Sequence, residues 1–138
     1  MSIRRLSSAL AVVLLLLSGG AVAPAAAQDT ARGVVYHDQN RNQQRDGEEA
    51  GLEGVSVSNG RTVVQTDADG RYTLPVREGD VVFVTKPAGY MVPVDAQNRP
   101  QFYYVHDPDG TPDSLDLKFP GVEPTGPLPE SINFPLHR

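Results

Sequence analysis

Short runs of β-branched and aromatic residues, separated by glycine, proline, asparagine and aspartate, constrain the fold of this chain more than any other feature. Such runs are typical of short β-strands joined by turns. They occur at residues 33–36, 54–58, 62–66, 71–74, 81–86, 102–105 and 115–119. The pattern predicts an all-β fold, a seven-strand antiparallel β-sandwich.

The residues between the runs favour tight turns. Asn59-Gly60 separates two runs and is a strong hairpin signal, because both residues tolerate positive φ. Asp67 to Gly70 predicts a second tight turn. No helical periodicity is recognisable after residue 27, and the 12 prolines of the chain would interrupt a helix repeatedly. The helix content is therefore predicted to be near zero.

Alternation along each run predicts which side chains enter the core, because successive residues of a strand point to opposite faces. Val81 and Phe83 are expected to face away from it. The predicted core comprises Val34, Tyr36, Val55, Val57, Val63, Tyr72, Leu74, Val82 and Val84.

The first 27 residues predict a cleaved secretory signal peptide. Arg4 and Arg5 precede an apolar run at residues 10–17, and three alanines stand before Gln28. The run is far shorter than the ~20 residues of a membrane-spanning helix. General secretion is favoured over the twin-arginine route, because Leu6-Ser7-Ser8 is not strongly apolar. The chain is thus expected in the periplasm or outside the cell, with no membrane contact after cleavage.

Removal of residues 1–27 from the 138 leaves 111, which suits one domain. With no cysteine there are no disulfides, so the core must hold the fold together. The remaining residues carry 10 basic and 17 acidic side chains, a formal charge of −7. Nucleic acid and anionic membranes are therefore unsuitable partners. We expect a β-sandwich domain at residues 28–119 and, because of five prolines, an extended connector at residues 120–138 that lies partly against the sandwich or a neighbouring domain.

The stretch from Asp38 to Glu49 has the side-chain spacing of a calcium-binding loop, with oxygen-bearing residues at positions 1, 3, 5, 9 and 12. Gln43 stands at position 6, where glycine is usual, and a left-handed conformation there would cost roughly 1 kcal/mol. A solvated polar loop is the alternative interpretation. The candidate ligands of a structural Ca²⁺ are Asp38, Asn40, Asn42, Gln44 through its carbonyl group, Asp46 and Glu49.

No catalytic or cofactor-binding residues can be named. His37, His106 and His137 are isolated in the sequence, and His37 and His106 are expected at the surface near strand ends. Tyr90 and residues 102–104 form the densest aromatic group, which could stack on a glycan, dock on a protein or simply cover a loop. A hydrolytic site within the chain is not expected.

Two motifs together resemble a known family. The first is GVVYHD with the acidic loop, running into EAGLEGVSVSNG at residues 49–60; the second is TDADGRYTLP at residues 66–75. They resemble immunoglobulin-like sandwich modules of the B-type repeat and carboxypeptidase-regulatory kinds. With VTKPAGY at residues 84–90, FYYVH at residues 102–106 and the proline-rich segment, the chain resembles the N-terminal domain of secreted calcineurin-like metallophosphoesterases.

The resemblance implies that such a domain precedes a catalytic domain that holds two metals through D-x-H, G-D-x-x-D, G-N-H-D and G-H-x-H motifs. None of these motifs occurs in the chain. The leading interpretation is a non-catalytic accessory domain, present as a fragment or truncated product, whose partner is a metallophosphoesterase catalytic domain in cis or lost. The alternative is a free-standing calcium-stabilised module that binds a glycan or a protein.

Overall fold

The computed structural model describes residues 28–138. The predicted signal peptide at residues 1–27 lies outside the described residues. The described part contains seven strands and no helix, as the sequence predicted. The strands are β1 (Asp29–His37), β2 (Ser56–Ser58), β3 (Val63–Gln65), β4 (Arg71–Val76), β5 (Asp80–Thr85), β6 (Tyr103–His106) and β7 (Phe134–Leu136).

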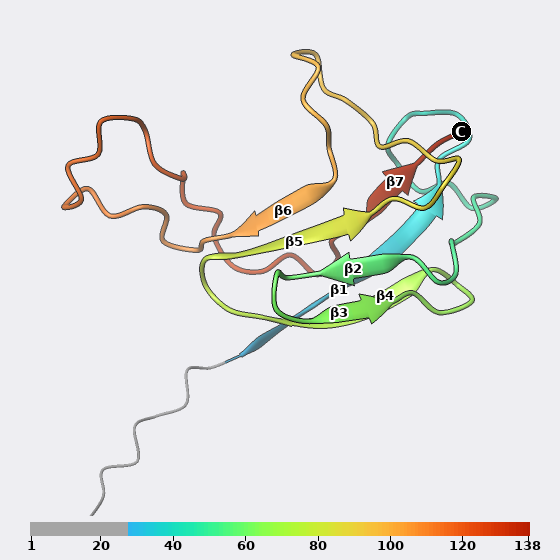
Figure 1. Ribbon diagram of the computed structural model, residues 1–138, viewed down its shortest axis with the longest axis horizontal. Helices are drawn as coiled ribbons and strands as arrows, with labels where there is room; N and C mark the ends of the chain where they lie inside the picture. Colours follow the sequence, from blue (N-terminus) through green and yellow to red (C-terminus); the bar gives the residue numbers. More distant parts are fainter. Residues whose placement is uncertain (1–27) are drawn as a thin grey trace, which may run out of the picture.

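The strands form two sheets, which pack as a β-sandwich (Figure 1). One sheet has the order β4-β1-β7 and the other the order β3-β2-β5-β6. All pairs are antiparallel except β1 and β7, which run parallel with Val35 opposite Phe134 and His37 opposite Leu136. The fold class predicted from the sequence is therefore confirmed, with one parallel pair in addition.

The seventh strand was predicted in the wrong place. Residues 115–119 form no strand, and the side chains of Leu115, Leu117 and Phe119 are exposed. The seventh strand lies instead in the segment expected to be a connector, where Ile132, Phe134 and Leu136 are all buried in the core. Pro135 is tolerated in this strand because β7 is at the edge of its sheet.

Side chains from both sheets fill the core between the layers. Six of the nine predicted core residues belong to it: Val55, Val57, Tyr72, Leu74, Val82 and Val84. Val81 is exposed and Phe83 is half-buried, so their predicted orientation holds.

The predictions for Val34 and Val63 are wrong by one residue in register. In β1 the side chains of Ala31 and Val35 are fully buried in the core, whereas Val34 is half-buried. In β3 Val64 is packed against the core and Val63 is 64% exposed. The four-residue turn at residues 59–62 pairs Ser58 with Val63, and therefore Val57 with Val64, on the core face. Tyr36 is buried as predicted, but outside the core cluster.

Both predicted turns are present. Gly60 has φ 84°, and the Asn59 side chain accepts hydrogen bonds from the backbone N–H groups of Arg61 (2.9 Å) and Thr62 (2.7 Å). Asp67 to Gly70 closes a turn with a 2.9 Å hydrogen bond from Gly70 to the Asp67 carbonyl group. This second turn carries the chain from one sheet to the other, because β3 and β4 lie in different sheets.

In the described part of the chain, no helix is long and apolar enough to cross a membrane.

Candidate functional site

The acidic loop leaves the sandwich at the end of β1 and returns beside the same strand. At its base, the N–H of His37 donates to Ala50, and the N–H of Leu52 donates to Val35, both over 2.9 Å. The N–H of Asp38 donates to the Leu136 carbonyl group at 2.9 Å. The loop is thus attached to both β1 and β7.

Asp38 organises the first half of the loop and is almost completely buried. Its two carboxylate oxygens accept hydrogen bonds from the backbone N–H groups of Asn42 (3.2 Å) and Gln43 (2.9 Å). Gln43, at the position where glycine is usual, has φ 60° and therefore adopts the left-handed conformation despite its cost, and Arg41 has φ 61° as well. The hydrogen bonds to Asp38 offset part of the cost of this conformation.

Asp46 and Glu49 organise the second half. One carboxylate oxygen of Asp46 accepts hydrogen bonds from the amide groups of Asn40 (2.6 Å) and Asn42 (3.1 Å). Glu49 is buried and accepts from the N–H groups of Gln39 (2.9 Å) and Asp46 (3.2 Å). The structure therefore joins all six predicted ligands in one hydrogen-bond network. It links Gln44 to them only by a hydrogen bond from its N–H to the Asn42 side chain (2.7 Å).

The loop places negative charge next to Tyr36. Burial, followed by the nearby carboxylates of Asp38, Glu49 and Asp46, raises the pKa of the Tyr36 hydroxyl to about 12, against a smaller opposite effect of Arg45. Nevertheless, no group of three or more His, Cys, Asp or Glu side chains in residues 28–138 is arranged to hold a metal ion. Any cation in the loop would need amide or carbonyl oxygens among its ligands.

The three histidines are not brought together. His37 contacts Tyr90 edge to face, with 5.5 Å between ring centroids. His137 pairs with Met91 through the backbone, in an isolated bridge. His106 is 1% exposed, so the expectation of a surface position is wrong. It points toward the core side of β6 with Nε2 3.6 Å from the Asp29 carboxylate.

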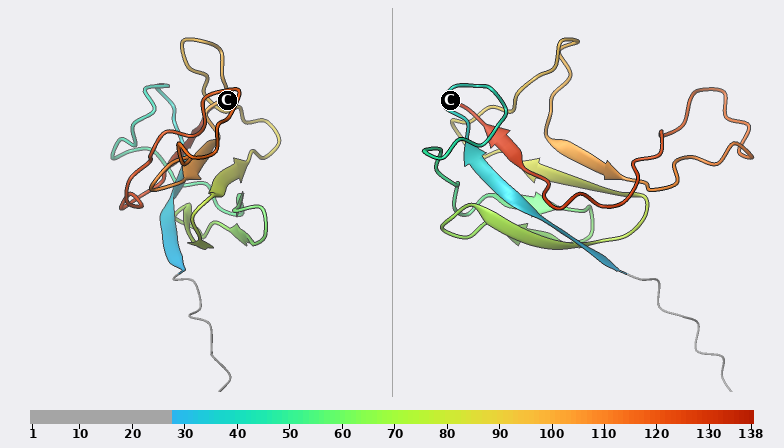
Figure 2. Two further views of the ribbon diagram at one scale, coloured as in Figure 1. Left: turned by 90° about the vertical axis from the view of Figure 1, so that its left-hand side faces the viewer. Right: turned by 180° about the vertical axis from the view of Figure 1, so that it is seen from behind.

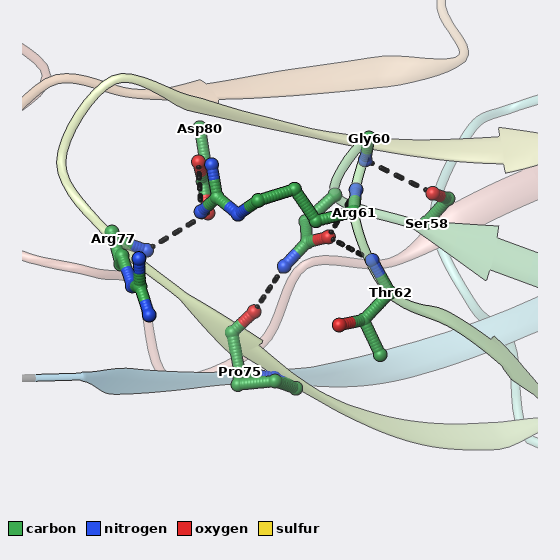
Figure 3. A network of polar contacts seen from close by, with 8 residues as sticks. Ser58, Gly60, Arg61, Thr62, Pro75, Arg77 and Asp80 are labelled. Carbon is green, nitrogen blue, oxygen red and sulfur yellow. Dashed lines mark hydrogen bonds and ion pairs between the residues drawn. The ribbon is translucent and has the colours of Figure 1, made fainter.

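Sequence reasoning missed a polar network that joins the β2–β3 turn to the start of β5 (Figure 3). The Arg61 guanidinium group donates to both carboxylate oxygens of Asp80 at 2.6 Å, and the N–H of Arg77 donates to the same carboxylate at 3.0 Å. Asp80 is buried. Residues 61 and 80 are too far apart in the sequence for a local motif to have revealed the pair.

A cavity of about 290 Å³ lies where β6 and β7 come close at the edges of their sheets. Of the predicted aromatic group it takes Tyr103 and Tyr104 but not Tyr90 or Phe102. Gln43, Gln101, Ser131 and Asn133 contribute polar groups, and no charged side chain lines the cavity. The Tyr104 hydroxyl is buried and has no hydrogen-bond partner.

The comparison with protein families decides what kind of domain carries these features. The model for the N-terminal domain of calcineurin-like phosphoesterase matches residues 39–120, more than half of the chain. The chain belongs to this family. The match begins in the acidic loop and contains strands β2 to β6 of this phosphoesterase N-terminal domain. Neither a curated protein nor a solved structure gives a significant match.

The family assignment confirms the resemblance seen in the motifs. The 138 residues hold the N-terminal domain and no catalytic domain, in agreement with the missing metal-binding motifs. The domain belongs with a phosphoesterase catalytic domain in the parent family.

Proposed function

We propose that this phosphoesterase N-terminal domain is a non-catalytic accessory domain, which binds and stabilises a two-metal catalytic domain encoded with it or separately. The family match over residues 39–120, in a chain without the catalytic motifs, is the observation that carries the proposal. Two-metal phosphoester hydrolysis needs a set of clustered ligands. The separated histidines of the described residues do not supply one.

The packing of the proline-rich segment restricts where a catalytic domain can bind. The segment was expected to lie partly against the sandwich or a neighbouring domain, and its Ile132, Phe134 and Leu136 side chains are buried in the sandwich. These side chains form part of the hydrophobic core of this domain. A catalytic domain would therefore have to bind another surface.

The test is to assay residues 28–138 with bis-p-nitrophenyl phosphate and manganese, and to titrate them into the purified catalytic domain of a full-length family member. We expect no metal-dependent turnover by the chain alone, and binding that raises the melting temperature of the catalytic domain. Turnover by the chain alone would contradict the non-catalytic role. Absence of both binding and stabilisation would contradict the accessory role.

We also infer that the domain is exported. The apolar run and the alanines before Gln28 support cleavage near that residue. Expression of the full chain, followed by N-terminal sequencing of the protein outside the cytoplasm, should give a first residue at or near Gln28. Retention of an uncleaved chain in the cytoplasm would contradict export.

We further propose that the acidic loop binds calcium weakly. Hard oxygen ligands would come from the buried carboxylates of Asp38 and Glu49, the nearby Asp46, the carbonyl group of Gln44, and the amide oxygens of Asn40 and Asn42, which accept hydrogen bonds from backbone N–H groups in this structure. A cation would relieve the repulsion among the three carboxylates, so calcium should raise the melting temperature. The expected Kd lies on the order of 10⁻⁴ to 10⁻³ M, typical of extracellular modules.

Calorimetric titration to about 10 mM calcium tests this, with Asp38→Ala as the variant that loses a ligand and Glu53→Ala, an exposed acidic residue outside the loop, as its control. Heat and stabilisation should be lost in the first variant and kept in the second. No heat and no shift in melting temperature, for wild type and Asp38→Ala alike, would leave the loop a solvated connection.

The second candidate function is a free-standing binding module for a neutral glycan, favoured by the uncharged cavity beside Tyr103 and Tyr104. Exposed tyrosine rings stack on sugar rings, and amide side chains hydrogen-bond their hydroxyl groups. Titration with a neutral hexose oligosaccharide should then show binding that Tyr103→Ala abolishes. Lack of binding in a panel of such oligosaccharides would eliminate this candidate.

A further inference from the structure

The longest excursion from the sandwich is the segment between β6 and β7. Residues 107–125, here named the projecting loop, extend away from both sheets (Figures 1 and 2). They line a broad cavity of about 690 Å³ on the inner side of the loop. No strand of the sandwich covers it, since the residues that line it all belong to the loop.

The stem of the projecting loop is closed by hydrogen bonds. The N–H of Thr125 donates to Asp107 (2.9 Å), and the N–H of Asp107 donates to the Thr125 hydroxyl group (3.0 Å). Further out, the N–H of Thr111 donates to Val122 (2.9 Å), and the N–H of Val122 donates to the Thr111 hydroxyl group (2.8 Å). The two sides are therefore held together along the stem. The hydrogen-bonded stem therefore supports the tip of the loop.

Beyond this stem the loop exposes large apolar side chains. Leu115, Leu117, Phe119 and Val122 are 53%, 56%, 72% and 42% exposed. They are four of the nine large hydrophobic side chains that are exposed in residues 28–138, concentrated in eight consecutive positions. Single exposed apolar residues need no explanation, but such a concentration is typical of an interaction surface.

The backbone at the tip is also without partners. None of the backbone hydrogen bonds within residues 28–138 involves residues 116–119. The sequence of this segment alternates apolar and charged residues, which is why it predicts a strand. A strand requires a neighbour, and none is present here. The segment therefore has both apolar side chains and backbone groups available to another molecule.

The charges on the projecting loop restrict what that molecule can be. Lys118 is its one basic side chain, whereas Asp107, Asp109, Asp113, Asp116 and Glu123 are acidic. An anionic lipid surface would be repelled. A second copy of this acidic chain would bring like charges face to face. A protein with an apolar depression bordered by lysine or arginine side chains fits both properties of the loop.

We propose that the projecting loop is the docking element for the phosphoesterase catalytic domain, with Leu117 and Phe119 in an apolar depression of that domain and the acidic residues against a basic rim. The proposal rests on the accessory role proposed above. The Phe134 and Leu136 side chains of β7 are buried, so the projecting loop is the surface that contacts the catalytic domain.

The experiment measures binding of residues 28–138 to the purified catalytic domain of a full-length family member by calorimetry. The loop variant is Leu117→Ser with Phe119→Ser. The control is Val63→Ser with Met91→Ser, which removes two side chains of similar exposure, 64% and 61%, outside the loop. We expect at least a ~10-fold weaker affinity for the loop variant and less than ~3-fold for the control. The melting temperatures of both variants should remain close to that of the wild type.

The charge component is tested by Asp113→Lys with Asp116→Lys, which should slow association and weaken its dependence on salt. If wild type and loop variant bind equally, the loop is not the docking element, while the accessory role stands. If the wild type does not bind, both proposals fall. Loop-dependent binding to neutral phosphatidylcholine vesicles, or loop-dependent dimerisation, in place of binding to the catalytic domain would also overturn the assignment.

Discussion

The hydroxyl group of Tyr72 on β4 donates a hydrogen bond to the backbone carbonyl oxygen of Ile132, just before β7, over 2.6 Å. The two residues are 60 positions apart and lie on either side of β1. Gly33 of β1 is paired with Tyr72, and a Cβ atom at this glycine would overlap the Ile132 carbonyl group. The missing side chain thus lets the final segment cross close to β1 and reach Tyr72.

Loss of this hydrogen bond should destabilise the sandwich. Tyr72→Phe keeps the ring but leaves a buried carbonyl oxygen without its partner, so we expect a decrease of about 1–2 kcal/mol in the free energy of unfolding. Urea denaturation measures it. Tyr103→Phe, at a 52% exposed residue, is the control and should change little. Equal stability of Tyr72→Phe and wild type would contradict the importance of the bond.

A side chain at Gly33 should be more damaging. Gly33→Ala forces the backbone of Ile132 away from β1, and we expect a loss of about 3 kcal/mol, the upper end for overpacking in a core. Gly47→Ala in the acidic loop is the matched control, because a Cβ atom there meets no atom within 4 Å. Thermal unfolding of the two variants should differ by more than 10 °C, at about 4–8 °C per kcal/mol for a domain of this size.

Alkaline pH should weaken the fold through Tyr72. Burial raises the pKa of its hydroxyl above the ordinary value, so the folded state keeps a proton that the unfolded chain releases. Stability is fully present below pH ~10 and falls as the pH rises above it, by at most about 1.4 kcal/mol per pH unit for one proton. Denaturation curves between pH 8 and 12 should show this decline, and Tyr72→Phe should make it less steep; the part that remains comes from Tyr36, whose pKa is raised as well. A decline equally steep in the variant would assign the effect to other groups.

The register of β1 can be tested with two adjacent valines. Val35→Ala removes a fully buried side chain and should cost about 2 kcal/mol, whereas Val34→Ala, at a half-buried position, should cost less than about 1 kcal/mol. Chemical denaturation distinguishes them. A larger cost for Val34→Ala than for Val35→Ala would support the register predicted from the sequence, with Val34 in the core.

Within the Arg61–Asp80 pair, replacement of Asp80 should destabilise the fold more than replacement of Arg61. Asp80→Ala leaves the N–H of Arg77 without its acceptor and should cost about 2 kcal/mol. Arg61 has a 53% exposed side chain, so water can partly replace it and Arg61→Ala should cost about 1 kcal/mol or less. A double-mutant cycle on urea denaturation gives the coupling, and a larger cost for Arg61→Ala than for Asp80→Ala would contradict this account.

Much of the acidic loop could be predicted from residues that are close together in the sequence. The loop spacing identified position 6, held by Gln43, as the place where a left-handed conformation is usual and costly without glycine, and Asp38 reaches the N–H groups four and five residues ahead. The attachment of the loop to β7 could not be predicted from the sequence. The N–H of Asp38 donates to the carbonyl group of Leu136, and the two residues are 98 positions apart. The Arg61–Asp80 pair could not be predicted for the same reason.

The sequence by itself determined the all-β class, most of the strands and the turns between them, because alternation and turn-forming residues act over a few neighbours. Only the tertiary structure decided where the seventh strand lies and which face of β1 enters the core. Residues 115–119 have the better strand pattern but find no neighbouring strand, whereas Phe134-Pro135-Leu136 has a proline and yet pairs with β1. A strand exists where a partner satisfies its backbone and a core accepts its side chains, and both conditions depend on residues far away in the chain.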